Sequence, residues 1–370
     1  MISREEVRDR FRAAFIGAII ANAIADKYDG MAATEIVKTT GGVGIELIKS
    51  VKRVGWNHVP MCTEDVIGKP GAASLLILTA AESLKQNNGF DPAGQAKSLI
   101  SLSSLPQAWE MSEATRRSLW EIKTGRNPNT PSDYRNDPES LDLDAIMRCI
   151  PLILHHGARF SDTSVLAEDL GRMCRITHAE PAVYLAAASI TPMLMWSFCM
   201  PDSFTRRRAI DEKDIVIDSL TRNSLREDFI SDETDEDIGM APVRCFDLPS
   251  EILEDHLKLR EAYPNRETLM DAVPFCMAVS LRNARSFAYA IQEVVNAGGA
   301  TGANAALVGA IVGANVGISG IPKEWRDACP DVASAREAAD GLLNLIRNDG
   351  RWMNSLPHPN SRQDEIIASC

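Results

Sequence analysis

The chain has 370 residues, 45% of them hydrophobic and 6% aromatic, and a formal net charge of −12. It is too apolar for a disordered protein, and its length suits one large domain or two ordinary ones. The acidity argues against general nucleic-acid binding, which depends on a basic surface. The low aromatic content favours close-packed helices over a β-sandwich.

The first residues predict the start of a helix and not a secretory signal. Ser3 precedes Glu5 and Glu6, and the charges up to Arg10 are mixed in sign. The eight cysteines are spread along the chain without a CxxC pair, which indicates reduced core residues and no disulfide framework. We therefore expect a cytoplasmic protein.

Apolar residues recur at helical spacing through most of the chain. Val7, Phe11, Phe15 and Ala18 follow each other at intervals of three or four residues. The same spacing predicts further helices over residues 71–86, 92–104, 112–123, 144–156, 163–175, 181–198, 251–260, 268–281, 284–296, 303–317 and 332–347. The alternation of apolar and polar residues that is typical of a strand is scarce, and residues 214–220 are the best candidate for a strand. An all-α fold is therefore predicted.

Residues 300–321 carry no charge and are numerous enough to span a bilayer. Gly309, Gly313 and Gly317 repeat every four residues, so they would line one helix face with almost no side chain. Such a face lets a neighbouring helix approach closely, in a soluble core as well as in lipid. We expect a buried central helix and no membrane segment.

Two polar segments interrupt the helical pattern. Residues 124–140 are rich in proline, glycine and asparagine, and their length suits a functional loop or an active-site lid. Residues 201–250 combine three arginines at 206–208 with an acidic run at 231–239. We interpret this second segment as a solvated, partly disordered insertion, and a partner-binding arm is the alternative.

Five segments follow one another in the order of the motifs of a known family. They are "RFRAAFIGAIIANAIADKYDG" at 10–30, "MSEATRRSLWEIKTGR" at 111–126, "DLDAIMRCIPLILHHG" at 142–157, "CRITHAEPAVYLAAASI" at 174–190, and residues 267–325, which end in a "GxxxxIPxEW" pattern. Together they make the sequence resemble the ADP-ribosylglycohydrolase family. The resemblance implies one all-α domain over residues 1–370, an orthogonal multi-helix bundle carrying the 201–250 insertion.

The family usually employs two Mg²⁺ ions, which need oxygen ligands, mostly carboxylates. The resemblance places its late "GGDTDTT" ligand stretch at residues 298–304, where this chain reads "GGATGAN". Ala300 and Gly302 replace the two aspartates and Ala303 replaces a threonine, and none of the three can bind a metal. Asn22 replaces a further carboxylate of the opening motif. We expect no di-magnesium centre and no metal cofactor.

Three carboxylates are nevertheless candidate catalytic residues. Asp29 lies where some family members carry a glutamate that acts on the attacking water. Thr63, Glu64 and Asp65 match the order of the family's early "TDD" stretch, although extra residues separate them from the following helix. An alternative alignment places residues 71–74 there and removes every ligand. We predict that Asp29, Glu64 and Asp65 carry acid/base chemistry, with pKa values raised by burial.

The late stretch also contains candidate ligand-binding residues. Gly298 and Gly299 precede a helix whose first N–H groups suit an anion such as a diphosphate, and the alternative is a simple tight turn. Thr301 and Asn304 belong to the same stretch. Arg148 lies in a motif that borders the ligand cleft in the family, where it would pair with a phosphate or form a buried structural ion pair.

The histidines of the motifs are expected to be structural. His178 would cap or pack a helix start, with Thr177 as the N-cap, and catalysis by His178 is the alternative. His155 and His156 end an apolar helix, where the negative end of the helix dipole suits them, and we assign them no metal.

The residues leave three functions open. The first is a metal-free hydrolase of a glycosidic bond in an ADP-ribose-like or nucleotide-type small molecule, with Asp29 or Asp65 activating water. The others are a catalytically inactive binder of an ADP-ribose-like ligand and a scaffold reused for a different reaction. We favour the hydrolase, with a small-molecule ligand and neither nucleic acid nor membrane as partner, and the sequence does not determine the oligomeric state.

Overall fold

The computed structural model describes residues 3–39, 69, 71–105, 109–131, 141–159, 161, 163–199, 201 and 248–348. These residues are mostly helical and contain no strand, only an isolated bridge between Ala32 and Gly298. The all-α prediction is confirmed. The elements are α1 (Arg4–Ala25), η1 (Asp26–Tyr28), α2 (Ala33–Thr39), α4 (Ala72–Gln86), α5 (Pro92–Leu102), α6 (Glu113–Lys123), α7 (Asp144–Arg159), α8 (Thr163–Arg175), α9 (Pro181–Cys199), α13 (Ser250–Leu253), α14 (His256–Ala262), α15 (Leu269–Arg282), α16 (Phe287–Ala297), α17 (Thr301–Val316), η6 (Ile318–Gly320), α18 (Lys323–Ala328) and α19 (Val332–Asn348).

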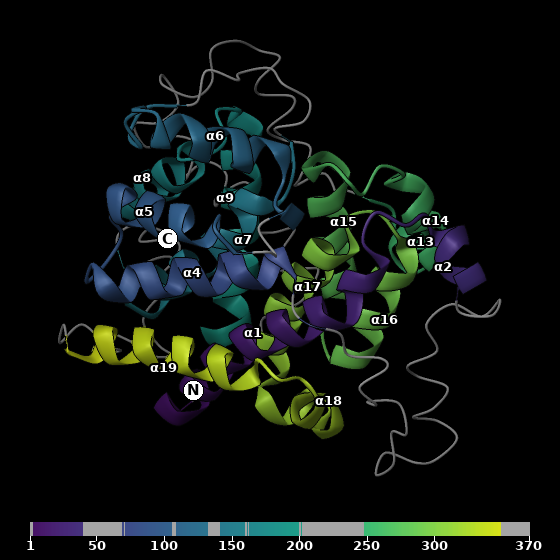
Figure 1. Ribbon diagram of the computed structural model, residues 1–370. Coiled ribbons are helices and arrows are strands. Elements are labelled where there is room, and N and C mark those ends of the chain that lie inside the picture. Colours follow the sequence, from purple (N-terminus) through teal and green to yellow (C-terminus); the bar gives the residue numbers. More distant parts are fainter. Residues whose placement is uncertain are drawn as a thin grey trace.

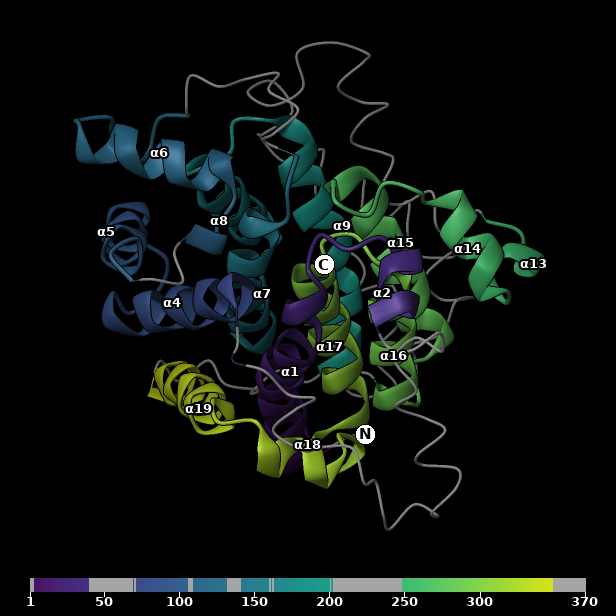
Figure 2. The same ribbon diagram turned by 45° about the vertical axis from the view of Figure 1, so that its right-hand side comes forward.

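Two helices from opposite ends of the sequence lie side by side in the middle of the molecule. Figures 1 and 2 show α1 and α17 in this central position, and these two helices share the most extensive contact of the fold. Helices α4 to α8 lie on one side of the pair, and α13 to α16 with α2 lie on the other. Helices α18 and α19 lie at one end. The centre of the fold therefore depends on contacts between distant parts of the chain.

Glycines explain how closely α1 and α17 approach. A Cβ atom on Gly17 would lie 2.3 Å from the carbonyl oxygen of Gly309, and one on Gly309 would lie 2.4 Å from that of Gly17. A Cβ atom on Gly313 would lie 2.5 Å from the carbonyl oxygen of Ala13. Because real side chains do not come so near a backbone oxygen, only hydrogen fits at these positions. The predicted buried central helix is confirmed.

Gly317 has a second role besides the one expected of it. Its φ of +73° ends α17, and its N–H donates to the carbonyl oxygen of Gly313 at 2.9 Å. It is thus the helix-ending glycine, and it also lies against α1, because a Cβ atom at this position would lie 2.7 Å from Asp9 Oδ2. The sequence spacing indicated the contact with α1 but not that the helix ends at this glycine.

Capping side chains decide several helix boundaries. Ser3 accepts the N–H of Glu6 at 3.1 Å, as predicted for the start of α1. The single helix expected over 251–260 is instead two, because Asp255 accepts the N–H of Leu257 at 2.9 Å and starts α14. Helix α16 starts later than expected, because Ser286 caps it.

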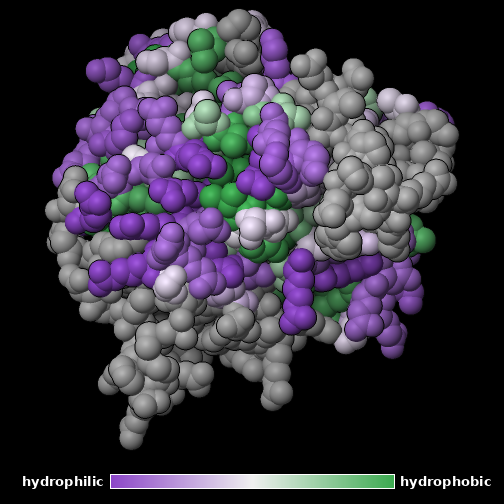
Figure 3. Space-filling view, turned by 90° about the horizontal axis from the view of Figure 1, so that it is seen from below, coloured by the Kyte–Doolittle hydropathy of each residue, from purple (hydrophilic) through white to green (hydrophobic). Residues whose placement is uncertain are grey.

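One helix of the described part, α9, is long and apolar enough to cross a membrane by length and composition. Its apolar window is 89% buried inside the protein, which accounts for its composition as a core helix. The segment considered from the sequence, α17, is shorter. Figure 3 shows the face seen from below Figure 1, where apolar residues gather at the centre and polar residues border them.

The cysteines within the described ranges are free, and all but the partly buried Cys199 are buried. Residues 214–220, the candidate strand, and nearly all of the 201–250 insertion lie outside these ranges.

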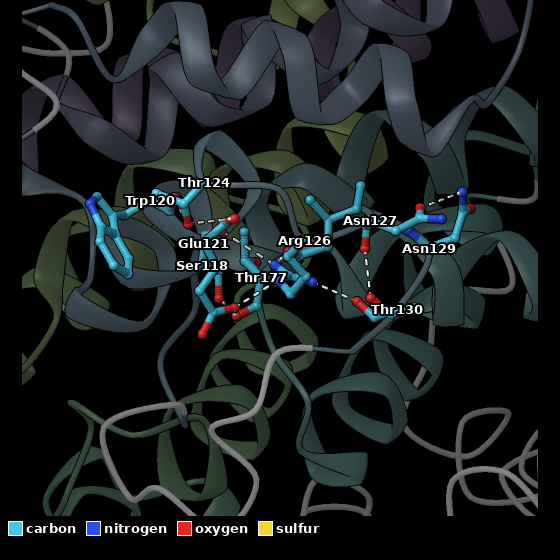
Figure 4. Close-up of polar contacts among 10 residues, drawn as sticks. Ser118, Trp120, Glu121, Thr124, Arg126, Asn127, Asn129, Thr130 and Thr177 are labelled. Atoms are coloured by element: carbon cyan, nitrogen blue, oxygen red, sulfur yellow. Dashed lines mark hydrogen bonds and ion pairs between the residues drawn. The ribbon is translucent and has the colours of Figure 1, made fainter.

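The first part of the 124–140 loop is fixed by Arg126, as Figure 4 shows. Arg126 pairs with Glu121 at 2.7 Å and donates to the carbonyl oxygens of Ile176 at 2.7 Å and Thr130 at 2.5 Å. These contacts join the loop to α6 and to the turn after α8. Residues 132–140, where a lid was considered, lie outside the described part.

Candidate functional site

The starts of α4 and α17 meet the end of α1. Asn22, in the last turns of α1, accepts with Oδ1 the N–H of Gly71 at 2.8 Å and the hydroxyl of Ser74 at 2.6 Å. Asp29, just after η1, accepts with Oδ1 the N–H of Gly302 at 2.8 Å. Polar side chains from the end of α1 thus satisfy free N–H groups at two helix starts.

Neighbouring charges contribute to the raised pKa values of Asp26 and Asp29. The charges of Glu110 and Asp29 act on Asp26, and the charge of Glu267 acts on Asp29. The four residues come from η1 and its end and from the segments before α6 and α15. We call them the acidic site: Asp26, Asp29, Glu110 and Glu267.

Two of these carboxylates converge on Gly302. A Cβ atom at this position would lie 3.4 Å from Asp26 Oδ1, 3.4 Å from Asp29 Oδ1 and 3.1 Å from Asn22 Nδ2. Because both oxygens lie 3.4 Å from the same point, Asp26 Oδ1 and Asp29 Oδ1 are separated by at most twice that distance. The position where the family carries a metal-binding aspartate is here a glycine that faces two carboxylates and an amide.

Asp26 is the strongly perturbed group of the site. Burial, followed by the charges of Glu110 and Asp29, raises its pKa to about 6, and the Asn22 amide opposes the shift. Its carboxylate lies over Gly71, where a Cβ atom would come within 1.7 Å of Oδ1. Sequence reasoning missed Asp26. Its one signal was its place three residues before Asp29 in the opening motif.

Asp29 keeps contact with solvent, and its carboxylate is partly desolvated. This desolvation, with the charge of Glu267, raises the pKa of Asp29. Hydrogen bonds from the Gly302 N–H and from Thr301 oppose the shift because they stabilise the charged form. Asp29 is thus a hydrogen-bonded, solvent-accessible carboxylate. The other two predicted catalytic residues, Glu64 and Asp65, lie outside the described residues.

Gly298 and Gly299 form a tight turn. Their φ angles are +76° and +89°, which side chains disfavour. The turn pairs with the segment after η1, through Gly299 N–H to Met31 O at 3.0 Å and Gly30 N–H to Gly299 O at 3.0 Å. The tight-turn alternative thus describes both glycines. The N–H of Gly302, at the helix start where a diphosphate was considered, is hydrogen-bonded to Asp29.

Thr301 and Asn304 are buried at the start of α17. Thr301 donates its hydroxyl to the carbonyl oxygen of Ala25 at 3.1 Å. Asn304 donates from Nδ2 to the carbonyl oxygen of Arg266 at 2.9 Å. Both side chains hold α17 against its neighbours, and direct ligand contact by either stays a prediction.

Arg148 lies in a buried polar network. Its side chain is 0% exposed and donates to Thr177 Oγ1. Thr177 Oγ1 lies 2.7 Å from His178 Nδ1, and His178 Nε2 lies 3.0 Å from Asp142 Oδ2. The contact of Arg148 is with a neutral hydroxyl, so both pairing with a phosphate and a buried structural ion pair stay predictions for this residue. The expected capping by Thr177 is wrong, because its hydroxyl serves this network and α9 starts only at Pro181.

His155 and His156 lie inside α7 and near its end. His156 Nε2 pairs with Asp169 at 3.0 Å. Burial, with the charges of His156 and Arg159, lowers the pKa of His155 to about 3. These contacts place the two histidines in the packing between α7 and α8.

The model of the ADP-ribosylglycohydrolase family matches residues 3–351. The chain belongs to the ADP-ribosylglycohydrolase family. Among solved structures, a chain described as an ADP-ribosylglycohydrolase-related protein complex aligns with a TM-score of 0.61 and 19% identity, covering 92% of this chain and 99% of that one. This likeness supports the all-α family fold. No curated protein matches the sequence.

The described residues do not fit the di-magnesium centre of the ADP-ribosylglycohydrolase family. Asn22 uses its oxygen for Gly71 and Ser74, so its Nδ2, a donor that cannot bind a cation, is the atom near position 302. Ala300 and Gly302 supply no ligand. In the part of the chain that the structure covers, no three His, Cys, Asp or Glu residues are placed to hold a metal ion. Residues 63–65 lie outside that part.

Proposed function

We propose that this family member hydrolyses the glycosidic bond of an ADP-ribose-like or nucleotide-type small molecule by carboxylate acid/base chemistry. The observation that carries the proposal is the convergence of Asp26 Oδ1 and Asp29 Oδ1 on Gly302. Glycoside hydrolysis uses a pair of carboxyl groups in two roles. Family membership supports the substrate class.

Asp26 is the general acid of this proposal. With a pKa raised to about 6, it keeps a proton well above the range of an ordinary aspartate. It gives this proton to the leaving atom as the bond between that atom and the anomeric carbon breaks. With this pKa, Asp26 is still protonated in about one-tenth of the molecules at pH 7.

Asp29 is the general base. The hydrogen bond from the Gly302 N–H fixes its carboxylate, and the residue is open to solvent. It accepts a proton from water as the water oxygen bonds to the anomeric carbon. Proton exchange with solvent then restores both carboxyl groups. Glu64 and Asp65, predicted from the sequence as further catalytic carboxylates, keep that assignment as part of the proposal.

The proposed chemistry proceeds without a di-magnesium centre. Positive charge develops on the sugar in the transition state of glycoside hydrolysis. The carboxylates of Glu110 and Glu267 stabilise this charge from the edge of the acidic site. Asn22 Nδ2 is a hydrogen-bond donor and disfavours a cation beside Gly302, which supports chemistry without a metal ion.

Turnover of ADP-ribose-like and nucleotide glycosides by the full chain in EDTA tests the proposal. We expect Asp26→Asn and Asp29→Asn each to lower kcat by about 100-fold or more. Asp327→Asn, on the exposed surface of α18 where Asp327 pairs with Lys323, is the matched control and leaves kcat unchanged.

Two outcomes contradict the proposal. One is turnover that neither Asp26→Asn nor Asp29→Asn slows. The other is turnover that appears only after Mg²⁺ is added. Binding of ADP-ribose without hydrolysis of any glycoside would instead favour the catalytically inactive alternative.

A further inference from the structure

Arg266 is a buried arginine in the segment that joins α14 to α15, next to Glu267 of the acidic site. Its guanidinium carbon lies 5.3 Å from the centre of the Phe275 ring, so the charge is held against an aromatic side chain of α15. Taking a charged group out of water costs free energy unless polar partners surround it. The partners of Arg266 therefore indicate what its burial achieves.

The guanidinium of Arg266 bridges the ends of two helices. Nη1 donates to the carbonyl oxygen of Arg260 at 2.9 Å and to that of Tyr263, at the end of α14. Nη2 donates to the carbonyl oxygen of Ala297, the last residue of α16, at 2.6 Å. The last carbonyl groups of a helix lack partners inside the helix and carry the negative end of its dipole. A planar fork of donors suits two such ends at once, whereas the single ammonium group of a lysine does not.

The backbone of Arg266 holds the start of α17. Its carbonyl oxygen accepts the N–H of Ala300 at 3.2 Å and a hydrogen bond from Asn304 Nδ2 at 2.9 Å. A Cβ atom on Gly299 would lie 2.8 Å from the same carbonyl oxygen, so the turn before α17 lies directly against it. The side chain and the backbone of one residue thus hold the end of α16 and the start of α17 together.

On its other side, the turn before α17 is bonded to the segment that carries Asp29. The two residues after Asp29 pair with the backbone of Gly299, and the N–H of Gly302 donates to Asp29 Oδ1 at 2.8 Å. The turn therefore lies between Arg266 and Asp29. A displacement of the turn moves the Gly302 N–H and with it the orientation of the Asp29 carboxylate.

We propose that Arg266 is a positioning residue of the acidic site, which clamps the turn between α16 and α17 so that the Gly302 N–H holds the Asp29 carboxylate in the orientation of a general base. This inference rests on the proposed function, in which Asp29 is that base. Arg266 acts through the backbone of α17 and takes no part in proton transfer. The hydrogen bond from Gly302 also opposes the rise in the pKa of Asp29, so the clamp favours the charged form of the base.

The NMR signal of the Gly302 amide in the full chain tests the clamp without any substrate. An amide proton donated to a carboxylate resonates downfield, and loss of the bond moves its signal upfield. Arg266→Met keeps the aliphatic stem and removes the guanidinium, so we expect an upfield shift of the Gly302 amide proton. The amide of Gly309, in the middle of α17, is expected to keep its signal. An arginine that only adds stability would leave the Gly302 signal of the folded protein in place.

Turnover provides the second readout. Misplacement of the base lowers kcat, whereas a residue remote from the substrate leaves KM in place. We expect Arg266→Met to lower kcat about tenfold or more and to keep KM within about twofold. Arg266→Lys keeps the charge without the fork, so its amide shift and its kcat are expected to lie between those of Arg266→Met and the parent. This conservative variant also carries the test if Arg266→Met does not fold.

Arg282 provides the matched control. It is the last residue of α15, about 20 Å along the helix from Leu269, and it pairs with Glu293 of α16 at 3.0 Å. Arg282→Met therefore removes an arginine that joins α15 to α16 far from the start of α17. We expect this variant to leave the Gly302 signal and kcat unchanged.

Failure of the clamp is distinguishable from failure of the proposed function. An unchanged Gly302 signal in both Arg266 variants would overturn the clamp whatever their stability, as would an equal shift in Arg282→Met. If the signal moves while Asp29→Asn keeps full turnover, the clamp stands and the acid/base proposal fails. If Asp29→Asn loses turnover while the Gly302 signal of the Arg266 variants stays in place, the clamp alone is wrong.

Discussion

Asp29 Oδ1 accepts a hydrogen bond of 2.8 Å from the N–H of Gly302, a residue 273 positions later in the chain. One carboxylate therefore has two roles. It caps α17, and it is the base of the proposed reaction. The two roles respond differently to substitution, which makes them separable.

Substitution of Asp29 by asparagine or alanine separates capping from chemistry. Asparagine keeps an acceptor for the Gly302 N–H. We therefore expect the free energy of unfolding, measured in urea, to differ between Asp29→Asn and the parent by less than about 1 kcal/mol. Asp29→Ala removes the acceptor and is expected to lose about 1 kcal/mol. Both lose turnover. Full activity in Asp29→Asn would show that only the cap matters.

The stability contribution of Asp26 is expected to depend on pH. Its pKa rises from 3.8 to about 6 on folding, so the folded state holds the proton more tightly. Its contribution is thus favourable at low pH and is lost as the pH rises through about 6. We expect Asp26→Asn to gain about 1 kcal/mol relative to the parent between pH 4 and pH 7, allowing for solvent screening of this half-buried group. Urea unfolding of both proteins at pH 4 and pH 7 measures this gain. The same difference in unfolding free energy at the two pH values would contradict the prediction.

Glu110 is expected to tune the acid through its charge. Glu110→Gln removes one of the causes that raise the pKa of Asp26. The high-pH decline of kcat, which follows deprotonation of the acid, should then move to lower pH. A full pH–rate profile measures this shift. Glu82→Gln, at a surface pair with Lys85 on α4, serves as control and should leave the profile in place.

The contact between α1 and α17 is expected to tolerate no added methyl group. Gly309→Ala would place Cβ 2.4 Å from the carbonyl oxygen of Gly17, and such overpacking costs about 1–3 kcal/mol. Gly341→Ala in α19 is the matched control, because its nearest neighbour is the flexible side chain of Lys85. Its stability should stay equal or rise. Equal urea midpoints for the two variants would contradict the prediction.

Part of the site was accessible from the sequence. Ala300 and Gly302 stand where the family has metal-binding aspartates, and alanine and glycine side chains have no atom that binds Mg²⁺ whatever the fold. Asp29 was named from its place in the opening motif, and its contact with Gly302 joins the two motifs. Asp26 was missed although it lies three residues before Asp29, and Glu110 and Glu267 were missed because no short spacing links them to the opening motif.

The sequence by itself determined the helical class, the capping of α1 by Ser3 and the small-residue face of α17, since each depends on neighbours within a few positions. The tertiary structure decided which carboxylates meet. Gly17 and Gly309 let the first and one of the last helices touch through their backbones, and that approach brings Asp26 and Asp29 to Gly302. Local residue spacing does not show that these residues come together, because their contact depends on close packing between segments that are far apart in the sequence.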